Sequence, residues 1–171
     1  ASVVELAILD ANGDVLRRYS SRDKAEPPHD EGNIPWYWIR PPHVLSTAPG
    51  MHRFTWDLHL TPVPTPRPQY PIAATPHDTA PVLLSPWVAP GTYTVQLTVD
   101  GKQSTQPLTV IIDPRVKTSL DDLRKQYAVS RQVYDELMAL DVAAKDLRAL
   151  RAPRADASKT PAAGASGQSA K

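Results

Sequence analysis

The sequence predicts a mainly β protein: an antiparallel immunoglobulin or fibronectin III-like β-sandwich with long proline-rich loops, followed by a C-terminal α-helix and a disordered tail. Short segments of alternating apolar and polar residues are separated by turn residues, and strands do not alternate with helices as they would in a parallel sheet. Helical periodicity follows only after residue 116. We therefore expect a sandwich over 1–116 with long loops at 20–50 and 61–90, an amphipathic helix over 118–151, and a disordered linker or tail over 152–171.

Two hairpins are predicted from turn chemistry. Residues 3–9 form the first strand, with Val4, Leu6 and Ile8 on one face, and residues 15–19 return after an Asn12-Gly13 turn, because this pair tolerates positive φ. Residues 90–114 form the second hairpin around Asp100-Gly101. Its apolar positions alternate and define an inward face: Tyr93, Val95, Leu97 and Val99 on one strand, and Leu108, Val110 and Ile112 on the other.

A further strand is expected over residues 51–60, which follow Gly50 and alternate in character. The predicted core face carries His52, Phe54, Trp56 and Leu58, and the opposite face Arg53, Thr55, Asp57 and His59. The segments on either side of it are rich in proline, of which the chain has 19. Proline has no backbone N–H to donate to the hydrogen bonds of a central strand. We therefore expect these segments to be irregular loops packed on a neighbour.

The helix should begin at Thr118 or Ser119, either of which can cap it, with acidic residues in the first turn, where the helix dipole favours them. Pro153 should end it. Its apolar stripe is a packing face, either for this sandwich or for a partner helix, and contains Leu123, Tyr127, Tyr134 and Leu137. Residues 154–171 contain no large apolar side chain, which is typical of disorder.

Composition excludes several classes of partner and site. The formal net charge is only +1, without a basic stripe, so nucleic acid is not an expected partner. No apolar run is long enough to span a membrane, and the absence of cysteine excludes disulfides and thiolate chemistry. The chain enters a strand directly without an initiator methionine, so we expect it to be a piece of a longer polypeptide.

The sequence predicts no catalytic residue, metal site or cofactor in this chain. The five histidines, His29, His43, His52, His59 and His77, lack metal-ligand spacing, and His52 and His59 would lie on opposite faces of one strand. A pair of carboxylates for glycoside hydrolysis would have to come from Glu26, Asp30, Glu31 and Asp57. The first three crowd a polar loop, and Asp57 is expected to accept backbone or loop hydrogen bonds instead.

The candidate binding residues are aromatic: Trp36, Tyr37 and Trp38, with Trp87 elsewhere in the chain. In an extended segment Trp36 and Trp38 would share one face and Tyr37 would oppose them. Two interpretations remain open. The rings cover the sandwich or seat it on another domain, or they stack on sugars as a carbohydrate-binding platform.

Five segments resemble a known family when taken in order. They are residues 33–38 (Asn-Ile-Pro-Trp-Tyr-Trp), 50–58 (Gly-Met-His-Arg-Phe-Thr-Trp-Asp-Leu), 90–95 (Pro-Gly-Thr-Tyr-Thr-Val), 106–110 (Gln-Pro-Leu-Thr-Val) and 113–116 (Asp-Pro-Arg-Val). Over roughly residues 3–150 the chain is similar to the C-terminal region of bacterial BNR/Asp-box, sortilin-like β-propeller proteins that are labelled glycosyl hydrolases. The first hairpin and the Phe-x-Trp-Asp segment also resemble the immunoglobulin-like module of flagellar hook-capping proteins.

The resemblance implies a non-catalytic C-terminal accessory module of a secreted or periplasmic bacterial protein. Its partner would be the upstream β-propeller of the same polypeptide, and it would frame one wall of a polysaccharide site. Any glycosidase activity would be expected in the propeller, so no catalytic residue is carried over, and no Asp-box occurs in these 171 residues. The alternatives are a carbohydrate-binding module that uses Trp36 and Trp38, and a chain that contributes to a glycoside hydrolase active site.

Overall fold

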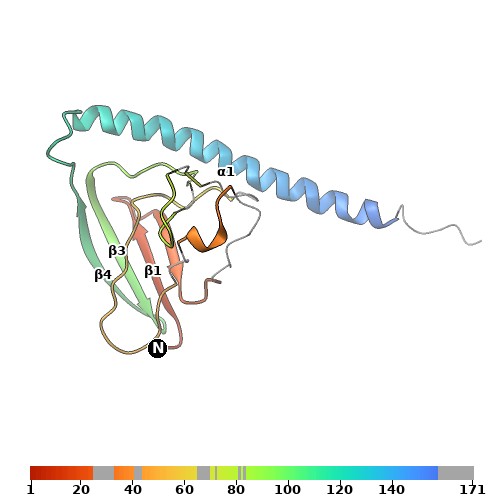
Figure 1. Cartoon of the computed structure of the whole chain (residues 1–171), viewed down its shortest axis with the longest axis horizontal. Coiled ribbons are helices and arrows are strands. Elements are labelled where there is room, and N and C mark those ends of the chain that lie inside the picture. The colour runs from red at the N-terminus through yellow and green to blue at the C-terminus, as the bar shows by residue number, and fades with distance from the viewer. Residues whose placement is uncertain are drawn as a thin grey trace, which may run out of the picture.

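The computed structural model describes residues 1–24, 33–40, 44–64, 70–71, 73–80, 82 and 84–157. Its regular elements are β1 (Val4–Leu9), β2 (Val15–Ser20), the short 3₁₀ helix η1 (Trp36–Trp38), β3 (Gly91–Val99), β4 (Lys102–Val110) and α1 (Leu120–Ala157). The four strands form one antiparallel sheet in the order β2-β1-β3-β4. α1 crosses one end of this sheet and continues beyond it, and the N-terminus lies at the opposite end (Figure 1).

Both predicted hairpins are confirmed. β1 pairs with β2 and β3 pairs with β4, and Leu6 of β1 faces Leu97 of β3 between the two hairpins. The turns use the expected residues: Gly13 has φ +89, and Asp100 and Gly101 have φ +48 and +83. Asp10 fixes the first turn, because its Oδ1 accepts hydrogen bonds from the backbone N–H groups of Asn12 and Asp14, each at 2.9 Å.

The strand that we expected over residues 51–60 is not part of the sheet. Its alternation survives, since Phe54 and Trp56 are half-buried while Arg53, Thr55 and Asp57 are exposed. Residues 51–58 have no regular strand pairing, and the backbone turns at Leu58, where φ is +60. We predicted His52 and Leu58 on the core face, but both are exposed. A period of two predicts an extended backbone, but a strand also needs a partner at the right distance along its whole length.

A second, irregular layer nevertheless covers one face of the sheet. Residues 58–63 and 84–88 run together through backbone hydrogen bonds from Leu60 N to Pro86 O (3.1 Å), Val63 N to Leu84 O (3.1 Å) and Val88 N to Leu58 O (2.9 Å). Thr61 N also donates to the carbonyl of Leu16 in β2 (3.0 Å). The core lies between these layers and consists of Ile8, Leu16, Leu60, Val63, Val88, Tyr93 and Tyr134.

α1 belongs to this core through one side of its first half. Tyr134 is buried, and Tyr127 and Met138 pack beside it, whereas Leu137, which we expected on the packing face, is 41% exposed. The helix thus packs on its own sheet domain, which settles the question that the sequence left open. Met138 replaces Leu137 because 3.6 residues per turn place residue 138, four positions after Tyr134, on the same side of the helix.

The ends of α1 differ from expectation in one respect. Ser119 caps the start, with its Oγ accepting a hydrogen bond from Asp122 N (3.1 Å) and donating one to the carboxylate of Asp122 (2.7 Å). The helix continues past Pro153 to Ala157, whereas we expected it to end near residue 151. Proline removes one backbone donor, and the arginine and alanine residues around it are good helix formers. The disorder that we predicted over 152–171 is therefore wrong for 152–157, which continue the helix, and 158–171 lie outside the described residues.

Candidate functional site: an exposed aromatic turn

The aromatic segment forms a tight turn and not the extended strand that we expected. Pro35, at φ −59°, precedes η1, and Trp38 N and Ile39 N donate to the carbonyls of Pro35 (3.0 Å) and Trp36 (3.1 Å). Proline presets a backbone angle that suits the start of such a turn. Three residues per turn spread the side chains about 120° apart, so Trp36 and Trp38 do not share one face.

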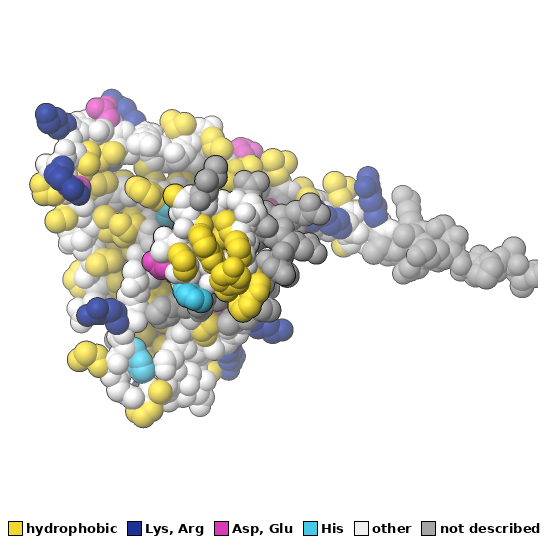
Figure 2. Space-filling model, viewed as in Figure 1, with side chains coloured by type: hydrophobic (Ala, Val, Ile, Leu, Met, Phe, Trp, Pro, Cys, Tyr) yellow, Lys and Arg dark blue, Asp and Glu magenta, His cyan; other side chains and the backbone are white. Residues whose placement is uncertain are grey.

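Two side chains of the turn project to the surface. Trp36 is 53% exposed and Tyr37 48%, and their ring centroids lie 5.9 Å apart with an angle of 87° between the ring planes. Trp38 is half-buried and Ile39 is buried. Figure 2 shows hydrophobic side chains gathered over η1 on the face that it presents. The described part of this aromatic site is therefore an edge-to-face pair and not a flat platform.

The turn is held by the segment around Thr79. Thr79 N donates to Trp38 O (3.0 Å), and Arg40 N donates to Thr79 O (2.8 Å), which gives an isolated parallel bridge. The buried Thr79 hydroxyl donates to Thr75 O and accepts from Thr75 N, both at 2.8 Å. Arg40 Nε also forms an ion pair with Asp78 at 2.8 Å. These bonds fix the backbone that carries the two exposed rings.

Trp87 has different contacts from the two η1 rings. It is 71% exposed and bridges to His59, whose ring it meets edge-to-face at 5.5 Å between centroids. The Trp87 indole N–H donates to His59 Nε2, and His59 Nδ1 lies 2.8 Å from the carbonyl of Ser85. A carbonyl only accepts and an indole N–H only donates, so in this arrangement His59 accepts at Nε2 and donates at Nδ1. Trp87 thus packs within the second layer, and its described ring contact is with His59 and not with Trp36 or Tyr37.

An apolar cavity of about 470 Å³ lies between Trp87 and α1. Its walls come from the second layer, from residues 110–116 and from the first half of the helix, and include Leu58, Trp87, Ile111, Val116, Leu123 and Tyr127. No sequence pattern predicts this cavity, because its walls come from four separate segments of the chain, around residues 58, 87–90, 110–116 and 123–130.

Asp57 does not have the surroundings of a catalytic carboxylate. Its Oδ1 accepts a hydrogen bond from His59 N (3.0 Å), and its Oδ2 lies 3.9 Å from the guanidinium of Arg17. The expectation that Asp57 accepts a loop hydrogen bond is confirmed. The carboxylates proposed as its partners, Glu26, Asp30 and Glu31, lie outside the described residues, as do His29 and His43.

Arg17 contacts Leu60, Tyr19 and Asp57, and the sequence analysis did not single it out. It is largely buried in β2, donates from Nη1 to Leu60 O (3.1 Å), and lies over the ring of Tyr19 at 5.0 Å from the centroid. Burial raises the pKa of the Tyr19 phenol, and the nearby Arg17 charge partly opposes this rise. The alternation of residues 15–19 marks Arg17 as facing away from Leu16, but it does not reveal the contacting loop.

In the described residues, no three histidine or acidic side chains come together closely enough to hold a metal ion. No helix there is both long and apolar enough to cross a membrane.

Comparison with known proteins gives no relative. The chain matches no family model, no curated protein and no solved structure.

Proposed function

We propose that this chain is a non-catalytic accessory module that docks on a neighbouring domain through the rings of Trp36 and Tyr37. The observation that carries the proposal is the exposure of these two aromatic side chains on a turn fixed by four backbone hydrogen bonds at residues 38–40 and 79. Aromatic residues contribute much of the contact energy where proteins meet. Rings that are already held in place lose little conformational entropy when a partner covers them.

The sequence resemblance suggests the identity of that neighbour. We propose that the module is the C-terminal part of a secreted or periplasmic bacterial protein, and that it docks on a BNR/Asp-box, sortilin-like β-propeller of the same polypeptide. In this role it stabilises the larger protein and frames one side of a polysaccharide site. The position of η1 within the motif at residues 33–38 supports this assignment, because two of the three aromatic residues of that motif, Trp36 and Tyr37, are exposed on the surface.

We further propose that the fold is a reduced immunoglobulin-like sandwich. The sheet β2-β1-β3-β4 supplies one layer, and residues 58–63 and 84–88 supply the other, joined by backbone hydrogen bonds but without long regular strands. Trp56 packs against Tyr93 across the core, with ring centroids 6.0 Å apart. Aromatic packing between the two layers is typical of sandwiches.

Hydrogen exchange tests the docking proposal, measured on this chain alone and within the longer polypeptide. We expect the backbone amides of residues 36–40 and 75–79 to exchange more slowly in the longer protein. Trp36→Ala should abolish that extra protection, whereas Trp87→Ala should leave it unchanged, because Trp87 is equally aromatic but packs on His59 and not on η1. Equal exchange of these amides in the two proteins would overturn the proposal.

A carbohydrate-binding role is the second candidate, and the exposed indole of Trp36 is the observation that favours it. Rings stack on sugars through their faces, but Trp36 and Tyr37 stand at 87° to each other, so only one ring at a time can lie flat on a sugar. Retention of the chain on insoluble polysaccharide, lost in Trp36→Ala and kept in Trp87→Ala, would favour this role over docking.

A further inference from the structure

A second unpartnered surface lies on α1, on the side that does not face the core. Its members are apolar, recur at spacings of four and three residues and are mostly exposed: Val133 (56%), Leu137 (41%), Leu140 (64%), the half-buried Ala144, and Leu147 (57%). This seven-residue repeat is typical of the contact face of a coiled coil. That face is narrower than the apolar face of a helix that packs on a globular core. We call these five residues the heptad seam.

The heptad seam is separate from the face that α1 uses for its own domain. The core face contains Leu123, Tyr127, Tyr134 and Met138, and at 100° per residue the seam lies about a quarter turn from it. The helix can therefore pack against its own sheet and against a second helix at the same time.

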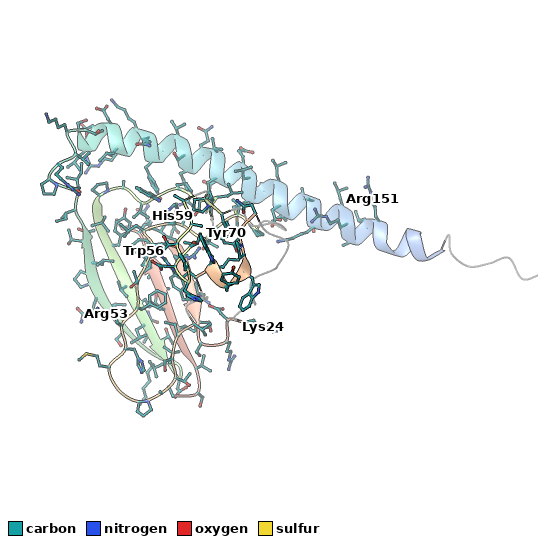
Figure 3. All side chains as sticks on the ribbon, viewed as in Figure 1. Lys24, Arg53, Trp56, His59, Tyr70 and Arg151 are labelled. Carbon is teal, nitrogen blue, oxygen red and sulfur yellow. The ribbon has the colours of Figure 1, made fainter. Side chains whose placement is uncertain are left out.

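The second half of α1 is largely exposed among the described residues. Every described side chain from Lys145 to Arg151 is exposed, and Figure 3 shows Arg151 on the part of the helix that projects beyond the sheet. A helical segment of this length is marginal in water without tertiary contacts. Leu147 and Leu150 are 57% and 72% exposed, so burying them against a partner would be favourable.

The charges of α1 identify the partner. Residues 120–141 contain five acidic and three basic side chains, whereas residues 142–151 contain three basic and one acidic. A second copy running antiparallel places the acidic half of each helix beside the basic half of the other. A parallel pair would instead place the two acidic halves beside each other and the two basic halves beside each other, which is unfavourable.

The antiparallel register follows from the seam. With Leu140 opposite Ala144 of the second copy, Leu137 lies opposite Leu147, and Arg151 comes into reach of Glu136. The exposed second half of each helix then lies beside the first half of the other helix, which packs on its own sheet domain. The two sheet domains therefore lie at opposite ends of the helix pair. We propose that the protein forms a homodimer through an antiparallel pair of α1 helices joined along the heptad seam.

Light scattering after size exclusion tests this on the full chain, over a range of concentrations. The expected mass is twice 18.7 kDa, and Leu140→Asp should reduce it to one chain. The matched control is Val142→Asp, because Val142 is as exposed as the seam residues (56%) but lies on another side of the helix. A wild-type monomer at every concentration, a larger oligomer, or equal effects of the two substitutions would overturn the proposal.

Disulfide cross-linking tests the direction of the pair and does not depend on a disruptive variant. The chain has no cysteine, so each introduced thiol is unique. A mixture of Leu137→Cys and Leu147→Cys proteins should form a mixed disulfide on mild oxidation. Leu147→Cys alone should not, because the two copies of residue 147 would be about 15 Å apart along the helix axis. Efficient cross-linking of Leu147→Cys to itself, without the mixed product, would indicate a parallel pair and overturn the proposal.

Discussion

The phenol of Tyr134 donates a hydrogen bond of 2.8 Å to the carbonyl of Thr61, 73 residues earlier in the chain. This contact joins α1 to the second layer at a point where Leu60 and Val63 are buried. Burial of the Tyr134 side chain also raises the pKa of its phenol. The ring and hydroxyl together fix the first half of the helix to the domain.

Removal of the Tyr134 ring should therefore detach α1 from the core. We expect Tyr134→Phe to lower the free energy of unfolding by about 1 kcal/mol, because only the hydrogen bond is lost. Tyr134→Ala should lower it by about 3 kcal/mol or more, because a cavity is also left. Urea unfolding followed by circular dichroism measures both. Val142→Ala, at an exposed position, is the control, with an expected change within about 0.5 kcal/mol.

The cap at Ser119 gives a second stability prediction. Ser119→Ala removes the acceptor for Asp122 N and should destabilise the protein by about 1 kcal/mol. Ser119→Asp should retain most of the stability, since a carboxylate can accept the same bond and favours the helix N-terminus. Thr118→Ala is the matched control, and an equal loss in that variant would show that Ser119 is not the cap. Thermal unfolding followed by the helical signal distinguishes these outcomes.

Local chemistry explains which elements were predictable from the sequence. The two hairpins depend on residues close together in the chain, such as Asn12-Gly13 and Asp100-Gly101, so alternation and turn type were sufficient. The prediction of a strand over 51–60 was wrong because strand formation depends on a distant partner: residues 58–63 are joined to 84–88 by backbone hydrogen bonds, while residues 51–57 are not part of a strand. Its side-chain alternation was right only at residues 53–57; its membership of the sheet and the burial of His52 and Leu58 were wrong.

Gly101 allows a direct test of the second turn. Its φ of +83 lies in a region that side chains with a Cβ rarely adopt, although nothing lies within 4 Å of the position that a Cβ would take. Gly101→Ala should therefore cost about 1 kcal/mol through backbone strain alone. Gly91→Ala is the control, because its backbone is not in that region and the nearest atom to an added Cβ is 4.0 Å away. Similar losses in both variants, measured by denaturant unfolding, would exclude strain as the cause.

The candidate site was predictable in its residues but not in its shape. Trp36 and Tyr37 were singled out from composition, and both are exposed at the surface. Their perpendicular arrangement depends on Pro35 and on hydrogen bonds to Thr79, about 40 residues away, which alternation cannot reveal. Trp87 was grouped with them by residue type alone, and the structure places it with His59.

Asp100 gives a prediction for acidic pH. Its Oδ1 accepts hydrogen bonds of 2.8 Å from the backbone N–H groups of Ser2 and Val3, and these bonds lower the pKa of its carboxyl group. The unfolded chain therefore binds this proton at a higher pH than the folded protein does. The stabilisation is complete above the unfolded pKa of about 3.9, and it is lost as the pH falls through the lower folded value.

The Asp100→Asn variant should lack this acid-dependent contribution, because its amide does not titrate. We expect the wild type to lose more stability than the variant between about pH 5 and pH 2, in urea unfolding at fixed ionic strength. Carbon-detected NMR titration of the Asp100 carboxyl in the folded protein should give a midpoint below that of an unstructured peptide. A midpoint at or above the peptide value, or parallel acid profiles for the two proteins, would show that the N-terminal strand is not held by this carboxylate.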